Sequence, residues 1–172
     1  MNEFSIPETF KFSDLAPTRD ELKFIYDWLI ANKIDGDVLE FGCGITTWAV
    51  YNAVKPKNYF ALETHPGCLV SMHEHLPQVK IIATTWNDIP KIPYGVVFVD
   101  SSVGRPAGGD GIYRDEAAKY GINLAARDAV VILHDVNMNR RGYQNTIKAV
   151  LAEEFKEVAR FKGRTGVGIY RR

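Results

Sequence analysis

The sequence has few of the features that assign a function directly. Its two cysteines, Cys43 and Cys68, lack the spacing of a metal site. It has no apolar run long enough to span a membrane and no recognisable signal peptide. Because two isolated thiols suit a reducing compartment, these absences predict a cytoplasmic protein without a membrane contact.

Charge of one sign is not in excess either, because 21 Lys and Arg residues balance 21 Asp and Glu residues. No basic run alternates with aromatic residues, which argues against a nucleic-acid-binding surface. A length of 172 residues suits one domain with its own hydrophobic core. We therefore expect a single domain over residues 1–172, with an irregular arm at 1–17, a leading helix at 18–33, a small-molecule partner, and a homodimer as the candidate assembly.

Signatures of nucleophilic and zinc-dependent catalysis are also missing. The chain has no Gly-x-Ser-x-Gly elbow. His73 and His75 stand two residues apart in a predicted helix, where they would not share a face. Cys43 stands between two glycines, where a small side chain suits a tight loop. These residues give no support to hydrolytic chemistry.

The most informative stretch covers residues 37–48. A short apolar run contains Glu40, and Gly42, Gly44 and Thr46 follow at alternate positions. Glycines let a ligand approach the backbone, and the free N–H groups of a following helix would point toward it. A dinucleotide-binding fingerprint would carry a third glycine where Thr46 stands. The stretch therefore predicts a nucleoside-binding turn and weakens the case for a dinucleotide.

Hydrophobic periodicity and turn residues predict an α/β protein. A capping box of Thr18 and Glu21 opens the first predicted helix. Five strands alternate with helices and a terminal hairpin follows, which predicts a Rossmann-like three-layer sandwich around a mostly parallel seven-stranded sheet. The predicted helices are 18–32, 46–54, 66–75, 112–124 and 142–155, and the predicted strands are 38–41, 59–62, 79–83, 96–100, 129–133, 158–161 and 167–170.

Acidic residues stand at the ends of four predicted strands, namely Glu40, Glu63, Asp100 and Asp135. Because parallel strands end at one edge of the sheet, these acids are expected along one rim, where ligands bind in open α/β folds. Glu63 follows Glu40 by 23 residues, close to the separation at which an acid accepts hydrogen bonds from ribose hydroxyls. The rim therefore predicts a nucleoside site.

The pattern Glu-x-Gly-x-Gly-x-Thr at residues 40–46 resembles motif I of the class I S-adenosylmethionine-dependent methyltransferases, whose fold also has a terminal antiparallel hairpin. The resemblance covers about residues 35–172 and implies S-adenosylmethionine as the cofactor. Trp86 would stack on the adenine or belong to the core, and Asn87 or Asp88 would accept from the adenine amine. The cofactor-binding residues it implies are Glu40, Gly42, Cys43, Gly44, Thr46, Thr47, Glu63, Trp86, Asn87, Asp88 and Asp100.

The second half resembles the glucuronoxylan 4-O-methyltransferase family of polysaccharide-modifying enzymes. The matching runs are 99–104, 111–113, 124–127 and 134–137, with Asn137 where that family has Asp. The resemblance implies O-methylation of a small-molecule or saccharide hydroxyl. Asp100, His134 and Asp135 become the candidate catalytic residues, since a histidine of near-neutral pKa or a carboxylate can deprotonate the acceptor. Arg105, Arg140 and Arg141 are candidates for binding a substrate carboxylate.

Other interpretations stay open. Asp100 and Asp135 are also placed like the metal-binding acids of catechol-type O-methyltransferases, but that family follows its second Asp with Asn, where this chain has Val136. We therefore expect no metal. Two other functions are a non-catalytic nucleoside- or protein-binding module of the same fold and, less favoured, an NAD-dependent oxidoreductase.

Overall fold

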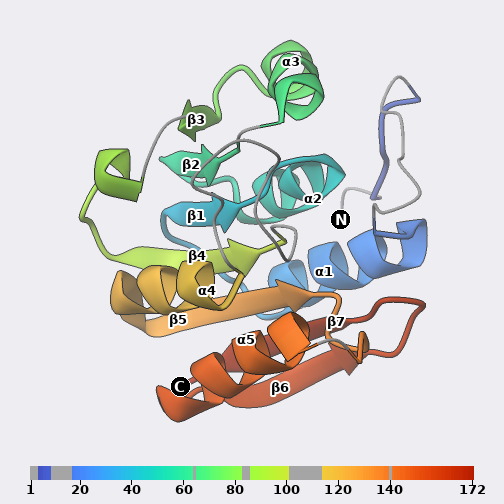
Figure 1. The fold of residues 1–172 in the computed structure, drawn as a ribbon. Helices are drawn as coiled ribbons and strands as arrows, with labels where there is room; N and C mark the ends of the chain where they lie inside the picture. Colours follow the sequence, from blue (N-terminus) through green and yellow to red (C-terminus); the bar gives the residue numbers. More distant parts are fainter. Residues whose placement is uncertain (1–3, 9–16, 64, 83–85, 101–113, 140) are drawn as a thin grey trace.

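Seven strands form one sheet in the computed structural model, which describes residues 4–8, 17–63, 65–82, 86–100, 114–139 and 141–172. The strand order is β3-β2-β1-β4-β5-β7-β6, and helices cover both faces of the sheet (Figure 1). The strands are β1 (Val38–Phe41), β2 (Tyr59–Leu62), β3 (Lys80–Ile82), β4 (Tyr94–Val99), β5 (Ala125–His134), β6 (Lys156–Phe161) and β7 (Val167–Arg171). The helices are α1 (Arg19–Ala31), α2 (Ile45–Val54), α3 (Pro66–His75), η1 (Trp86–Asp88, a 3-10 turn), α4 (Arg114–Asn123) and α5 (Arg141–Ala152).

The directions of the strands confirm the expected fold class. Strands β3, β2, β1, β4 and β5 pair in parallel, whereas β7 pairs antiparallel with both β5 and β6. The sheet is therefore mostly parallel, with the terminal hairpin at one edge, as the sequence pattern predicts.

Alternate residues of the central strands supply two hydrophobic cores. Val96 and Phe98 of β4 pack with residues of α1, α2 and α3, while Val97 and Val99 pack with residues of α4 and α5. Successive strand residues point to opposite faces, so a strand buried on both sides must be apolar throughout. This explains the continuous apolar runs of β4 and β5.

Some element bounds differ from those predicted. Strand β5 begins four residues early, at Ala125, because Ala125 pairs with Tyr94 before the register shifts. The exposed Arg127 and Asp128 hide this start from a hydrophobicity pattern. Helix α5 ends at Ala152, and Phe155, which was predicted to be helical, is buried in the turn before β6. Residues 112–113 of the predicted fourth helix and residue 83 of the third strand lie outside the described residues.

None of the described helices combines the length and apolar character that a membrane crossing requires.

A buried carboxylate shapes the glycine loop between β1 and α2. Glu40 is fully buried and accepts hydrogen bonds from the hydroxyls of Thr46 (3.1 Å), Thr47 (2.7 Å) and Tyr59 (2.8 Å). The Thr47 hydroxyl also accepts from the Gly44 N–H at 3.0 Å. Glu40 was expected on the rim with the other strand-end acids, but it lies beneath the loop and acts on it through the two threonines.

The surroundings of Glu40 change its titration. Burial raises its pKa from 4.5 to about 8, the hydroxyl donors of Thr47 and Tyr59 oppose this shift, and the charge of Asp100 adds to it. The folded state therefore binds this proton more tightly than the unfolded chain does. The stabilisation from the proton is complete below about pH 4.5 and is lost as pH rises through about 8.

We predict that Glu40→Gln removes this pH dependence. Between pH 4.5 and about pH 8 the free energy of unfolding of the parent protein should fall by on the order of 4 kcal/mol more than that of the variant. Urea denaturation across pH measures the difference. Glu116→Gln changes an exposed carboxyl of α4 and should leave the parent profile unaltered. The prediction would be contradicted if the free energy of unfolding changed equally with pH in Glu40→Gln and in the parent protein.

Candidate functional site

The glycine loop lies between the ends of two neighbouring strands. The Gly42 N–H donates to the Leu62 carbonyl (2.9 Å), and the Asp100 N–H donates to the Phe41 carbonyl (2.8 Å). The main chains after β1, β2 and β4 therefore leave the sheet side by side, at the edge where parallel strands end. Gly42 has φ +86°, a conformation that favours glycine.

Glu63, directly after β2, is held against this loop. Its Oε2 accepts from the Cys43 N–H at 3.1 Å, and its Oε1 accepts from the His65 N–H at 2.7 Å. A Cβ added at Gly44 would meet no atom of the described residues within 4 Å. Each carboxylate oxygen accepts more than one hydrogen bond, so Glu63 can also accept from ligand hydroxyls. An acid beside a loop with open space fits the ribose side of a nucleoside cofactor.

Cys43 takes part through its backbone. Burial raises the pKa of its thiol, and the charges of Glu40 and Glu63 raise it further, so the sulfur stays protonated. A nucleophilic role is therefore unfavourable, in agreement with the sequence interpretation.

Trp86 belongs to the wall of the second core. It is half-buried, with ring centroids 6.2 Å from Phe41 and 5.1 Å from Tyr120, and the Tyr120 hydroxyl donates to its carbonyl at 2.9 Å. Asn87 and Asp88 follow it on η1 and are exposed. Trp86 therefore packs in the core, which is one of the two roles that the sequence predicted for it. Its stacking on an adenine ring stays a prediction, as do the contacts of Asn87 or Asp88 with the adenine amine.

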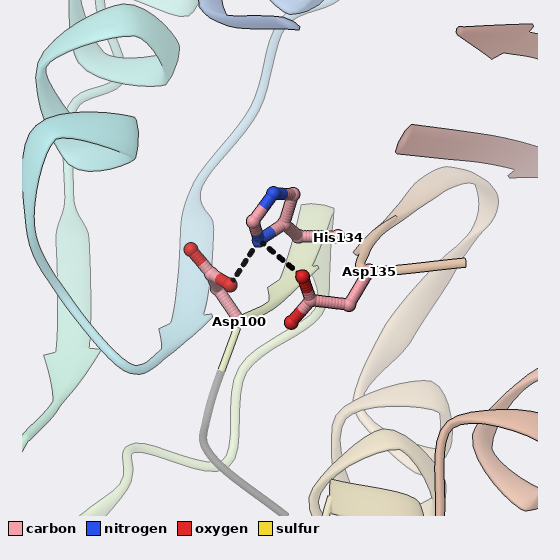
Figure 2. A group of neighbouring side chains, drawn as sticks. All are labelled: Asp100, His134 and Asp135. Carbon is pink, nitrogen blue, oxygen red and sulfur yellow. Dashed lines mark hydrogen bonds and ion pairs between the residues drawn. The ribbon is translucent and has the colours of Figure 1, made fainter. Parts of the chain in front are cut away.

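Asp100, His134 and Asp135 come together where β4 and β5 end (Figure 2). His134 Nδ1 lies 2.7 Å from Asp100 Oδ1 and 3.4 Å from Asp135 Oδ1. The imidazole is fully buried, while both carboxylates stay partly exposed. Asp135 has φ +60°, a left-handed conformation that is uncommon outside glycine and costs free energy. The sequence predicted that Asp100 and Asp135 lie along one rim of the sheet, and the structure adds that His134 contacts both of them.

The environment of His134 makes it a cation. Burial lowers the pKa of the ring, but the charge and hydrogen bond of Asp100 and a contact with Glu21 outweigh this and raise the pKa to about 10. Its Nε2 lies 2.9 Å from the Thr165 hydroxyl, so both ring nitrogens have partners. The expectation of a near-neutral histidine base is therefore corrected, since the ring is already protonated at neutral pH.

Asp135 is better suited than His134 to accept a proton. Burial raises the pKa of its carboxyl, while the charges of His134 and Arg114 lower it, and the net shift is upward. A carboxylate of raised pKa accepts a proton more readily than an ordinary one. Arg114 Nη1 lies 3.7 Å from Asp135 Oδ2.

Arg114, at the start of α4, is a site residue that the sequence interpretation missed. It is almost fully buried and donates to the carbonyls of Val99 and His134, the last residues of two neighbouring strands. Its guanidinium lies 5.0 Å from the centroid of the Tyr143 ring. No local pattern marked Arg114, because its partners are 15 and 20 residues away in sequence.

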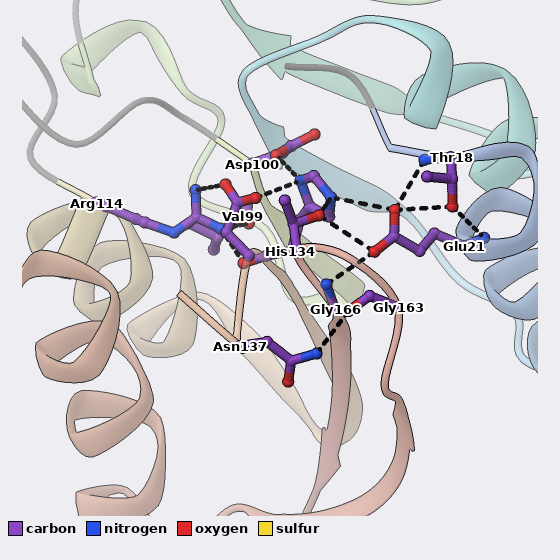
Figure 3. A network of polar contacts seen from close by, with 11 residues as sticks. Thr18, Glu21, Val99, Asp100, Arg114, His134, Asn137, Gly163 and Gly166 are labelled. Carbon is purple, nitrogen blue, oxygen red and sulfur yellow. Dashed lines mark hydrogen bonds and ion pairs between the residues drawn. The ribbon is translucent and has the colours of Figure 1, made fainter. Parts of the chain in front are cut away.

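Glu21 was also missed as a site residue, although its capping box with Thr18 was predicted and is present. The carboxylate is buried and lies 3.9 Å from His134 Nε2 (Figure 3). Its contacts reach Gly166, 145 residues along the chain, and such a distance leaves no sequence signal.

Asn137 contacts a turn, and no contact joins it or Arg141 to the three-residue cluster among the described residues. Asn137 Nδ2 donates to the Gly163 carbonyl at 3.0 Å, so this side chain holds the turn between β6 and β7 (Figure 3). Arg141 is exposed on α5, and Arg105 and Arg140 lie outside the described residues.

One atom each of Asp100, His134 and Asp135 lies within 4.8 Å of the others, a spacing that could hold a metal ion. An ion bound to Nδ1 would have to replace the proton that this nitrogen shares with Asp100.

No protein-family model and no curated protein matches the sequence. Solved structures do match the fold. The O-methyltransferase from Bacillus cereus, in complex with S-adenosylhomocysteine, has a TM-score of 0.70 at 13% identity, covering 93% of this chain and 84% of its own. The N-methyltransferase NodS from Bradyrhizobium japonicum WM9, also with S-adenosylhomocysteine, has a TM-score of 0.67 at 14% identity, covering 89% and 86%.

A third similar structure is the precorrin-6y C5,15-methyltransferase from Geobacter metallireducens GS-15, with a TM-score of 0.68 at 15% identity, covering 95% of this chain and 93% of its own. The finer likeness to glucuronoxylan 4-O-methyltransferases finds no support among these structures and stays a prediction. The chain therefore has the Rossmann-like fold of the class I S-adenosylmethionine-dependent methyltransferases.

Proposed function

We propose that the protein is an S-adenosylmethionine-dependent methyltransferase that methylates a hydroxyl oxygen of a small molecule or saccharide. The observation that carries the proposal is the carboxylate of Glu63 held 3.1 Å from the Cys43 N–H across the glycine loop, in a sheet of methyltransferase order. This arrangement provides acceptors for ribose hydroxyls beside a loop that a ligand can approach.

The acceptor half of the proposal is supported by the rim beyond β4 and β5. A hydroxyl must lose its proton when its oxygen is methylated, and Asp135 is a partly exposed carboxylate of raised pKa. Asp100 lies between Asp135 and the glycine loop, on the side expected for the cofactor. The choice of oxygen as the acceptor atom is supported by this carboxylate and by the resemblance of the second half to saccharide O-methyltransferases.

The chemistry is one in-line displacement. Bound S-adenosylmethionine supplies an electrophilic methyl group. The methyl group would pass to the acceptor oxygen, and the cofactor would leave as S-adenosylhomocysteine with the electron pair of the carbon–sulfur bond. Asp135 takes the hydroxyl proton, and His134 and Arg114 balance the negative charge of the two aspartates before the proton arrives.

We predict that S-adenosylhomocysteine binds the purified protein and that Glu63→Ala weakens this binding by roughly 1–3 kcal/mol, because buried hydroxyls of the ligand would lose their acceptor. Isothermal titration calorimetry measures both affinities. Glu74→Ala removes an exposed carboxyl from α3 and should bind like the parent protein.

NAD is titrated in parallel. Binding of S-adenosylhomocysteine, binding of NAD alone and binding of neither compound indicate three different functions. Binding of NAD alone would indicate an oxidoreductase. Binding of neither compound would contradict the proposal and favour a module without catalysis.

We predict that Asp135→Asn lowers kcat by about 100-fold or more and changes the Kd for S-adenosylhomocysteine by less than about threefold, since it removes a base and spares the cofactor side. The assay measures S-adenosylhomocysteine released with catechols, hexoses and uronic acids as acceptors. Asp128→Asn, at an exposed position of the same strand, should keep the parent kcat. Parent-like turnover in Asp135→Asn would rule out this base.

A further inference from the structure

We propose that Glu21 is a positioning residue of the site, which acts through Thr165 to fix the His134 ring and thereby orients the carboxylates of Asp100 and Asp135 toward the acceptor. The inference rests on the proposed methyltransferase function and assigns parts of α1 and of the β6–β7 turn to that same site.

Each carboxylate oxygen of Glu21 accepts two hydrogen bonds. Its Oε1 accepts from the Gly166 N–H at 2.8 Å and from the Thr165 hydroxyl at 3.1 Å. Its Oε2 accepts from the Thr18 N–H at 2.8 Å and from the Thr18 hydroxyl at 3.0 Å. These four bonds connect the start of α1 with the turn before β7, so Glu21 fixes the position of Thr165.

The number of hydrogens on each group determines which atom donates in every hydrogen bond between Glu21 and Asp100 (Figure 3). The Thr165 hydroxyl has one hydrogen and donates it to Glu21. At 2.9 Å from His134 Nε2 its oxygen can then only accept, so Nε2 carries a hydrogen. Nδ1 faces Asp100 at 2.7 Å and donates to that carboxylate. The ring is thus held from behind by Thr165 and in front by the aspartates.

A helix cap alone does not explain the burial of Glu21. A capping box needs one acceptor at the third helical position, and a glutamine provides it equally well. An acid that served only the cap could remain in water, whereas burial of a carboxylate costs several kcal/mol per ion unless other groups compensate it. Glu21 has 0% exposure and partners 144 and 145 residues away in sequence. Its placement is therefore better explained by the ring that it holds.

Two substitutions separate this role from folding. A glutamine at position 21 has one oxygen and one NH₂ group, so it can satisfy either the cap or the donors of Thr165 and Gly166, but not both. Thr165→Val keeps the shape of a half-buried side chain and removes only the bridging hydroxyl. Asp20→Asn, the exposed neighbour on the same helical turn, is the matched control.

The experiment records the ring N–H signals of His134 by ¹H–¹⁵N NMR, with His134→Asn for assignment, and then S-adenosylhomocysteine affinity and kcat. We expect slowly exchanging N–H signals at both ring nitrogens in the parent protein and in Asp20→Asn. In Glu21→Gln and Thr165→Val the Nε2 signal should exchange rapidly, and kcat should fall about tenfold while the Kd for S-adenosylhomocysteine changes less than about twofold.

Unchanged ring signals in both variants, or changed signals with parent-like kcat, would overturn the inference. A fall in kcat that matches an equal loss of cofactor affinity would also overturn it, because that result describes a general structural defect. Failure of the proposed function is seen separately, since it would leave the parent protein without S-adenosylhomocysteine binding while the ring signals still report whether Glu21 and Thr165 fix His134.

Discussion

The site depends on the buried ring of His134, whose positive charge compensates the negative charges of several carboxylates. Taking an unpaired charge out of water is expensive, and Glu21, Asp100 and Asp135 all lie within 4 Å of the His134 ring nitrogens. The nearby His134 ring and the hydrogen bonds from Thr18 and Gly166 outweigh the burial of Glu21 and hold its pKa well below its usual value. The protonated ring and these acids therefore stabilise one another's charged forms.

A second buried carboxylate, Glu40, does the opposite. It has hydroxyl donors and no cation among its contacts in the described part of the chain, and its pKa rises. Burial of an acid thus has two outcomes in this fold. One acid stays charged and fixes a histidine, and the other is readily protonated and supports a loop.

The sequence predicts the parts of the site that depend on local order. Strand-end position was enough to predict that Asp100 and Asp135 lie along one rim of the sheet, and the spacing from Glu40 to Glu63 located the acid beside the glycine loop. It could not predict Arg114 or Thr165, because their roles arise from partners that only the folded sheet brings near. The predicted start of β5 was also wrong, because two exposed charged residues of this strand precede its apolar run.

The place of β7 in the sheet has a consequence for the order of folding. This strand inserts between β5 and β6, although it follows both in sequence. Until it pairs, the edge of β5 is open and His134 lacks the hydroxyl of Thr165 behind it. Pairings between distant segments form slowly because loop closure costs entropy before contacts repay it. The cluster of Asp100, His134 and Asp135 would therefore acquire its final geometry late, after the glycine loop between β1 and α2 has formed.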